Sequence, residues 1–329
     1  MTQSQATGSY IGIEVEQRYP RTILGTCCVP WRDDWSLDED MFRAEIRGLL
    51  THGYRDLYVF GTAGEGYAVS DCQFDQIVGV FREETDSPDV RPMVGVISLS
   101  LATIIERIER AAALGFGVFQ IALPSWGTLN DRELMLFFQE VCGRFPKLRF
   151  LHYNLVRAGR ILTAKEYAVL AEAHPNLVAT KLGGRQVQTA VELVREVPQV
   201  QHFLTEHNFA AASLVGPCSL LASSSTSNLQ RARWFFQAGV ARDADHLRLL
   251  AQELVAVGEA MRRVAPDTVH MDGGYDKLLS RLHLPQFPLR LLPPYEGISE
   301  AVFDRFRAAL AADHPQWLPS GLTPGPSPS

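Results

Sequence analysis

The segment 178–184 (VATKLGG) ends an apolar run with a lysine, Lys181, placed directly before two glycines. The whole run, 177–182, is nearly all apolar and does not alternate, which is typical of a parallel strand covered on both faces. A lysine at the end of such a strand is unusual, because most lysines lie on solvated surfaces. A second run, 148–154 (LRFLHYN), ends in a similar way near Tyr153. Both segments predict a buried strand that stops at residues able to do nucleophilic or acid–base chemistry.

The same strand-and-helix unit repeats along the chain. Eight strand-like runs lie at 22–30, 56–60, 91–97, 117–124, 148–154, 177–182, 200–205 and 217–223. Helical patterns follow them, first near Ser36 (an expected N-cap with Glu39 as its capping-box partner) and then over about 71–84, 100–114, 130–143, 163–173, 186–196, 207–214 and 228–238. Strict alternation indicates an α/β fold with a parallel sheet, and eight units favour a closed (β/α)8 TIM barrel. FGTAGEG (60–66) has its glycines in the wrong places for a dinucleotide fingerprint or a P-loop.

The pattern changes after the eighth unit. Only helical patterns remain there, over about 241–264, 272–283 and 297–311, and the chain ends in the Pro/Gly/Ser-rich stretch SGLTPGPSPS. We therefore expect an N-terminal tail (1–19), a barrel (20–240), a C-terminal helical region (241–312) and a disordered tail (313–329).

Composition narrows the class of function. The chain has 329 residues, 46% of them apolar, and a net charge of −6 with no basic stripe, so nothing indicates a nucleic-acid partner. No apolar run is long enough to span a membrane, and the N-terminus has no apolar core of a signal peptide. The five cysteines show no CxxC or zinc spacing, and their odd number indicates reduced thiols in a cytoplasmic protein. We expect no membrane partner, no metal and no other cofactor.

The polar residues where the strands end are the candidates for the site, because active sites of such barrels lie at the C-terminal ends of the strands. An apolar environment lowers the pKa of a lysine, and a neutral Lys181 amine is a nucleophile that forms a Schiff base with a ketone. The protonated imine withdraws electrons from the adjacent carbon, which is class I aldolase chemistry. Tyr153, one strand away, can shuttle protons with help from the Thr62 hydroxyl. Backbone N–H groups of the turn 61–66 can hold a carboxylate.

Each candidate also has a structural interpretation. A lysine at a strand end often reaches solvent or forms a salt bridge, and a tyrosine at the edge of a core often only satisfies its hydroxyl. Glu65 can be an acid, but it is more simply an anchor of its turn. The serine-rich segment 223–227 fits a substrate-binding loop and a plain polar loop equally well.

Three motifs taken together resemble one known family. FGTAGEGYAVS (60–70) is similar to a G-[TS]-[TS]-G-E turn, and the block from Tyr153 to Thr163 is similar to Y-N-x-P followed by T-G. PNLVATKLGG (175–184) is similar to a strand that carries an imine-forming lysine. These motifs are those of the dihydrodipicolinate synthase / N-acetylneuraminate lyase family of pyruvate-type Schiff-base lyases, and the resemblance covers about residues 20–312.

The resemblance implies roles for individual residues. Lys181 would form the imine, Tyr153 would be the catalytic acid–base, and Thr62 would belong to the proton relay. The N–H groups of Thr62 and Ala63 would hold the carboxylate of pyruvate or a related 2-keto acid, and the protein would be a homodimer or homotetramer. The candidates for substrate binding are Gly61, Ala63, Trp126, Arg157, Glu206 and Leu220.

The chain also departs from the family pattern. Ala63 replaces a second hydroxyl, and Trp126 stands at the place of a relay tyrosine that is often supplied across a subunit interface. Arg157 is one residue closer to Tyr153 than the arginine that it resembles. Glu206 adds a negative charge unless Arg157 pairs with it. These departures argue against dihydrodipicolinate synthase proper, and the Trp126–Ala63 combination resembles the hydratase-aldolase branch, which splits aromatic 2-keto acids.

Four hypotheses follow. The leading one is a Schiff-base lyase or aldolase that makes or breaks a carbon–carbon bond of a 2-keto acid, or dehydrates one. The others are dihydrodipicolinate synthase proper, a non-catalytic relative that binds a keto acid, and a metal-dependent barrel enzyme. The aldehyde or second substrate and the direction of reaction are open at this point.

Overall fold

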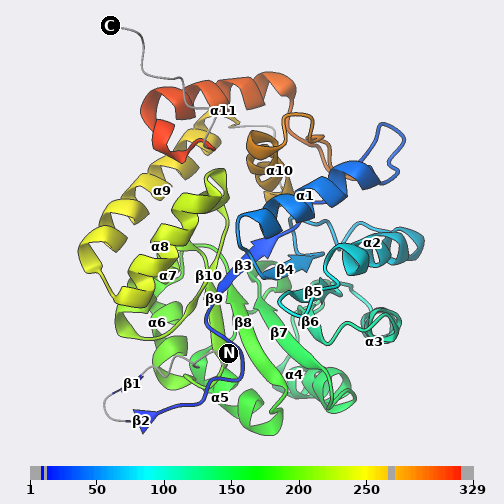
Figure 1. The fold of residues 1–329 in the computed structure, drawn as a ribbon. Coiled ribbons are helices and arrows are strands. Elements are labelled where there is room, and N and C mark those ends of the chain that lie inside the picture. Colours follow the sequence, from blue (N-terminus) through cyan, green and yellow to red (C-terminus); the bar gives the residue numbers. More distant parts are fainter. Residues whose placement is uncertain (1–8, 11–12, 266–270, 320–329) are drawn as a thin grey trace, which may run out of the picture.

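Eight parallel strands close into a barrel, so the prediction of a TIM barrel is confirmed (Figure 1). The computed structural model describes residues 9–10, 13–265 and 271–319. Neighbouring strands follow the order β10-β3-β4-β5-β6-β7-β8-β9 around the barrel. Their bounds are β3 Ile23–Thr26, β4 Asp56–Val59, β5 Arg91–Gly95, β6 Val118–Ile121, β7 Arg149–Asn154, β8 Leu177–Leu182, β9 Gln201–Leu204 and β10 Ser219–Leu221.

Helices cover the outside of the barrel. They are α1 Glu39–Thr51, α2 Asp71–Glu84, α3 Leu101–Ala113, α4 Asp131–Phe138, α5 Ala164–Ala173, α6 Val187–Glu196, α7 Glu206–Val215 and α8 Leu229–Ala241. Helix α2 has the bounds that the pattern predicted, because Ser70 and Gln73 form a capping box at its start. The helix expected over 130–143 is instead α4 followed by a π-helical turn, Gln139–Gly143.

The start of α1 differs from the prediction. Ser36 is not its N-cap, because the Ser36 hydroxyl donates a hydrogen bond to Asp34 at 2.6 Å within a turn. Asp38 caps the helix instead and accepts a hydrogen bond from the Met41 N–H at 3.3 Å. A short acidic side chain next to the first helical residue, Glu39, has therefore replaced the expected capping box.

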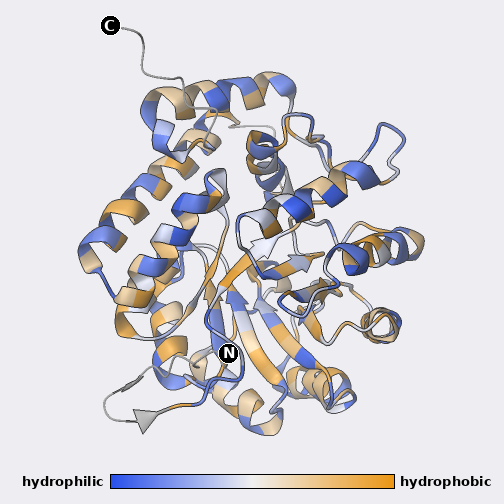
Figure 2. Cartoon of the chain, viewed as in Figure 1, coloured by the Kyte–Doolittle hydropathy of each residue, from blue (hydrophilic) through white to orange (hydrophobic). Residues whose placement is uncertain are grey.

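The core has two layers. Inside the barrel lie Tyr19, Leu24, Tyr58, Met93, Leu151, Val178, Ala179, Phe203 and Leu221. A larger apolar layer lies between the strands and the surrounding helices, and Figure 2 shows the helices with hydrophobic and hydrophilic stretches that alternate along them. Because successive strand residues point to opposite faces, the strands contribute to both layers, which explains why they show no regular alternation of apolar and solvent-exposed residues.

Three further helices follow the barrel. They are α9 Ala244–Val264, α10 Asp272–His283 and α11 Glu300–Asp313. Helix α9 runs beside α7 and α8, and α10 and α11 lie at the end of the barrel toward which the strands point (Figure 1). Two buried contacts hold α10 against the barrel. The Lys277 ammonium forms an ion pair with Glu65 at 2.5 Å, and the Ser280 hydroxyl donates to Glu45 at 2.7 Å. Helix α10 is thereby fixed across the C-terminal ends of the strands.

Both ends of the described chain carry structure. Ser9–Tyr10 (β1) pair with Ile13–Glu14 (β2) in an antiparallel hairpin, within the range expected to be an N-terminal tail. The helical region extends past residue 312, because Pro315–Trp317 form a 3-10 turn and the indole of Trp317 is buried. The rest of the expected disordered tail, 320–329, lies outside the described residues. Within the described ranges, no helix is both long and apolar enough to cross a membrane.

Candidate active site

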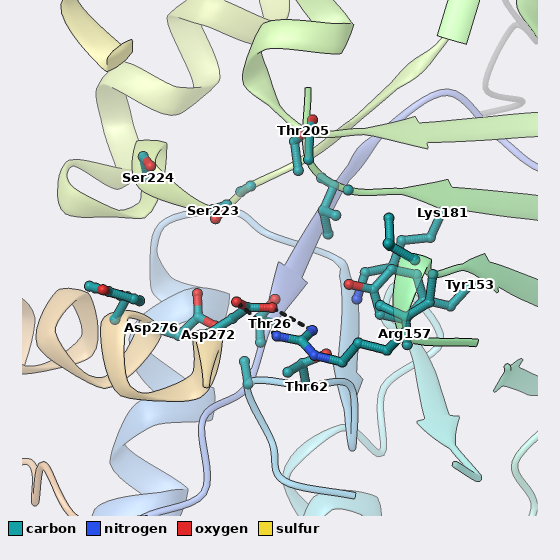
Figure 3. Close-up of a pocket in the computed structure, with 18 of the residues that line it drawn as sticks. Thr26, Thr62, Tyr153, Arg157, Lys181, Thr205, Ser223, Ser224, Asp272 and Asp276 are labelled. Carbon is teal, nitrogen blue, oxygen red and sulfur yellow. Dashed lines mark hydrogen bonds and ion pairs between the residues drawn. The ribbon is translucent and has the colours of Figure 1, made fainter. Parts of the chain in front are cut away.

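A cavity of about 630 Å³ opens at the C-terminal ends of the strands. Strand ends and the loops that follow them form one side, with Lys181 and Tyr153 among the lining residues. Helix α10 forms the facing side through Asp272 and Asp276 (Figure 3). The cavity therefore lies where the barrel geometry predicted an active site.

Lys181 reaches this cavity from β8 and is almost completely buried, with 2% of its surface exposed. Its Nζ donates hydrogen bonds to the Tyr58 hydroxyl at 2.8 Å and to the Gln120 carbonyl oxygen at 3.2 Å. Burial lowers the pKa of Lys181 to about 7, although Asp276 and Asp272 oppose that shift. The neutral amine, which is the state that attacks a carbonyl, is therefore accessible near neutral pH.

Tyr153 lies beside Lys181 because the two residues pair in register on β7 and β8. The Lys181 Nζ lies 4.1 Å from the centre of the Tyr153 ring. Burial raises the pKa of Tyr153 to about 12, and a hydrogen bond with the Thr62 side chain opposes the shift. At neutral pH the tyrosine is therefore protonated and can serve as an acid.

The turn after β4 depends on glycine and on Glu65. A Cβ at Gly61 would lie 2.4 Å from the Tyr58 ring and 3.2 Å from the Lys181 Nζ, so a larger residue would displace them. Glu65 accepts hydrogen bonds from the Trp31 indole at 2.8 Å and from the Leu292 N–H at 2.6 Å, in addition to its ion pair with α10. The structural interpretation of Glu65 as an anchor of the turn is confirmed. The turn places Thr62 and Ala63 at the cavity wall.

Arg157 lines the cavity but pairs with a residue that the sequence did not indicate. Its guanidinium forms an ion pair with Asp272 at 2.9 Å (dashed line in Figure 3). Glu206, which we considered as its partner, is buried and accepts hydrogen bonds from the Ser223 N–H at 2.7 Å and the Ser225 N–H at 2.9 Å. Glu206 therefore supports the loop after β10, and the residues that line the cavity do not include it.

Two other substrate-binding candidates also lie outside the cavity lining. Leu220 faces the helices, since it packs in the outer layer, and its neighbour Leu221 faces the barrel interior and lines the cavity. The prediction is one residue off in a strand whose faces alternate, and a shift of one residue reverses the side-chain direction. Trp126 is 90% exposed and does not line the cavity, so its expected contact with substrate is not present in this chain alone.

Sequence reasoning missed several residues that line this site, and four of them bear on its chemistry. Thr26 and Tyr58 lie in apolar strands, where no alternation shows which side chains turn inward. Asp272 and Asp276 lie four residues apart on one face of α10, and this spacing of two acids was the available signal. Burial, together with the charge of Asp272, raises the pKa of Asp276 to about 7.

The described residues contain no group of three or more His, Cys, Asp or Glu side chains arranged to hold a metal ion.

The serine-rich segment is divided between two roles. Ser223 and Ser224 line the cavity, whereas Ser225 is buried and its hydroxyl donates to Glu206 at 2.8 Å.

Comparison with known sequences identifies relatives of this chain. The profile of the Dihydrodipicolinate synthetase family matches residues 19–271. A 4-hydroxy-tetrahydrodipicolinate synthase from Exiguobacterium sp. is 25% identical over 178 residues, which cover 54% of this chain and 59% of that protein. A probable 5-dehydro-4-deoxyglucarate dehydratase from Saccharopolyspora erythraea is 29% identical over 189 residues, which cover 56% and 58%. These matches span little more than half of the length of the relatives.

Comparison with solved structures supports the fold. YagE, a prophage protein of the dihydrodipicolinic acid synthase family from E. coli K12, was solved in complex with pyruvate and superposes with a TM-score of 0.78 at 19% identity. The superposition covers 88% of this chain and 97% of that protein. At this level of identity the likeness establishes a shared architecture and nothing about substrate.

Proposed function

Because the chain belongs to the dihydrodipicolinate synthetase family, we propose that it is a lyase or aldolase that forms a Schiff base with pyruvate or a related 2-keto acid. The observation that carries the proposal is Lys181, whose amine is buried at a cavity wall with a pKa lowered to about 7 by burial. A lysine in that state attacks a ketone without an added base. The names of the relatives, a synthase and a dehydratase, agree with this class of reaction.

The proposed reaction begins with Lys181. Its neutral Nζ bonds to C2 of the keto acid, the keto oxygen takes up a proton, and the resulting carbinolamine loses water to give an iminium ion. Tyr153 is protonated at neutral pH and supplies the proton for the leaving water, with Thr62 hydrogen-bonded to its hydroxyl. The iminium then accepts the electron pair of a C3–C4 bond that breaks, or of a C3–H bond whose proton is removed. In the second case the enamine so formed expels a hydroxyl from C4, which leaves as water after taking up a proton.

The turn 61–66 is our proposed site for the carboxylate of the substrate. Thr62 and Ala63 lie at the cavity wall next to Lys181, and backbone N–H groups of such turns bind anions. Ala63 has no hydroxyl, so the carboxylate has one hydrogen-bond donor fewer than in the family pattern. We expect weaker binding of the keto acid by roughly a factor of ten as a result, since such a hydrogen bond contributes about 1–2 kcal/mol.

The first test is reduction with borohydride in the presence of pyruvate, followed by peptide mass mapping. We expect an adduct of pyruvate on Lys181. Lys277 is a matched internal control, because it is also buried but is paired with Glu65 and does not line the cavity. An adduct on Lys277, or on neither lysine with a panel of 2-keto acids, would contradict the proposal.

Three further measurements separate the remaining alternatives. Binding of a keto acid that survives Lys181→Ala without turnover of any substrate would support a non-catalytic relative. Activity that a chelator abolishes would support a metal-dependent enzyme. Condensation of pyruvate with an aldehyde that carries a second carboxylate would support dihydrodipicolinate synthase proper, although Arg157 is already engaged by Asp272. A cytoplasmic location stays a prediction.

We further propose a homodimer or homotetramer. An indole that is 90% exposed, at Trp126, supports this assembly, because large aromatic side chains are enriched in interfaces. Light scattering of the purified protein gives the mass directly. Trp126→Ala should weaken the assembly if the indole is buried between subunits, and an unchanged mass would exclude that position from the interface.

A further inference from the structure

Two hydroxyls lie in series behind the amine of Lys181. The Tyr58 hydroxyl accepts a hydrogen bond from the Lys181 Nζ at 2.8 Å and a second one from the Thr26 hydroxyl at 2.7 Å. Thr26 and Tyr58 are register partners on the adjacent strands β3 and β4, so the fold itself sets their spacing. Both residues line the cavity. A continuous hydrogen-bonded path thus runs from the amine to the cavity.

We propose that Tyr58 and Thr26 form a proton relay that carries protons between the Lys181 amine and the cavity during imine formation and hydrolysis. This inference rests on the proposed function, since it assigns a role within that reaction. The relay has no counterpart among the residues that the sequence motifs indicated.

The relay balances without a charged intermediate. The Thr26 hydroxyl donates to Tyr58 in this structure, so both hydroxyls first rotate until Tyr58 donates to Thr26. The Lys181 ammonium then gives a proton to the Tyr58 oxygen as Tyr58 passes its own proton to the Thr26 oxygen. Thr26 in turn releases its proton to water in the cavity, and the amine is left neutral with both hydroxyls restored. Burial holds the pKa of Tyr58 well above its ordinary value, so a lasting phenolate is disfavoured and the transfers must be concerted.

The other neighbours of the amine cannot perform this transfer. Gln120 accepts a hydrogen bond from Nζ, but its amide does not exchange protons readily. The rings of Tyr58 and Tyr153 both lie about 4 Å from Nζ (4.2 and 4.1 Å to their centres), but of these two residues it is Tyr58 whose hydroxyl accepts a hydrogen bond from Nζ. Trp126 is exposed, and an indole N–H is a donor only.

A second observation shows that the chain makes room for this arrangement. Gly61 lies against the Tyr58 ring, and a Cβ there would come within 2.4 Å of it. The absence of a side chain at Gly61 leaves room for the Tyr58 ring, whose hydroxyl contacts Nζ.

The pH dependence of the relay involves a defined set of neighbours. Asp272 and Asp276 on α10 raise the pKa of Lys181 against the effect of burial. Tyr153 on β7, Asp276 and Cys28, which follows β3, act on Tyr58. None of these groups lies between Lys181 and Tyr58, which are in direct contact.

The experiment measures the rate of imine formation, by quenching with borohydride at increasing times and counting adducts on Lys181 by mass spectrometry. We expect Tyr58→Phe to slow the reaction by about 10- to 100-fold while the final amount of adduct is unchanged, since general acid–base groups contribute about 10²–10⁴-fold. Thr26→Val should slow it about 10-fold, and Thr26→Ser should restore it. Added imidazole should accelerate Tyr58→Phe but not the wild type, and the double variant should be no slower than Tyr58→Phe.

Several results would overturn the relay. These are an unchanged rate in Tyr58→Phe, an equal loss in Thr26→Ser and Thr26→Val, or no acceleration by imidazole. If Tyr58→Phe does not fold, as judged by circular dichroism, the two Thr26 variants decide alone. A wild type that forms no adduct with any 2-keto acid would overturn the proposed function and the relay with it. A wild type that forms the adduct at the same rate as the variants overturns only the relay.

Discussion

Lys181 and Lys277 are both buried lysines within the same mouth of the barrel, yet their surroundings differ. Lys277 is 0% exposed and forms an ion pair with the equally buried Glu65 at 2.5 Å. The hydrogen bonds of Lys181 go to an uncharged hydroxyl and an uncharged amide, and its amine lines a cavity. Burial lowers the pKa of both, but Glu65 opposes the shift at Lys277.

The difference shows that burial alone does not make a lysine reactive. The nearest acceptor decides whether the amine is held as an ammonium or released as a nucleophile. A carboxylate in contact favours the ammonium and fixes α10 to the turn 61–66, whereas neutral acceptors leave Lys181 free to lose its proton.

The largest effect is expected from Lys181→Met. This change removes the nucleophile, so we expect kcat/KM to fall by on the order of 10⁴-fold or more and the borohydride adduct to disappear. The free energy of unfolding should fall by only about 1–2 kcal/mol, because two neutral acceptors lose a donor. Retained activity in steady-state assays would show that Lys181 is not the imine-forming residue.

The converse change is Lys277→Met, which leaves the Glu65 carboxylate buried without its cation. We expect the free energy of unfolding to fall by about 3–5 kcal/mol in urea titrations. Lys277→Met combined with Glu65→Gln should recover part of that loss, because the charge is then removed as well. The folded fraction should still form an adduct on Lys181. A stability equal to that of the wild type would mean that the ion pair does not hold α10.

Asp276→Asn sharpens the comparison by changing the charge near the reactive amine. The Asp276 carboxylate raises the pKa of Lys181, so its loss should lower that pKa further. The rate of imine formation increases with pH as Lys181 loses its proton near pH 7, and the midpoint should move to lower pH by about one unit or less. A pH–rate profile of adduct formation measures the shift. A midpoint that moves upward would contradict the assigned sign.

The smallest effect concerns the exposed ion pair between Arg157 and Asp272. Its side chains are 41% and 57% exposed, so Arg157→Met should change the free energy of unfolding by less than about 1 kcal/mol. Its consequence should appear in KM for substrates with a second anionic group near the cavity mouth. A KM that is unchanged across acidic and neutral substrates would exclude Arg157 from recognition of the substrate.

Much of the fold was predictable because each strand and helix carries its own local signal. Apolar runs marked all eight strands, and the helical pattern over 71–84 matched α2, whose start Ser70 and Gln73 cap in the structure. The start of α1 was mispredicted because Ser36 and Asp38 are both good N-caps, and a turn stabilised by Asp34 decided between them. The local sequence pattern therefore does not determine which of these two residues caps α1.

The site was predictable only in part. Lys181, Tyr153 and Thr62 stand at strand ends, where the geometry of a barrel brings them to one cavity. Leu220 was misassigned and Tyr58 was missed for one shared reason, since a strand that is apolar on both faces does not reveal which residues point inward. The α10 acids were missed because nothing local indicates which loops a helix nearly one hundred residues after Lys181 will face.

Because of the position of α10, the active-site cavity depends on both the barrel and the C-terminal helical region. Asp272 and Asp276 of this helix form one wall of the cavity. The next residue, Lys277, forms the ion pair with Glu65 that attaches the helix to the turn beside Lys181. Truncating the chain to its eight barrel units would therefore remove one wall of the active-site cavity together with the ion pair that holds it in place. A design that transplants new loops onto this barrel should keep residues 271–283 and Glu65 together, unchanged.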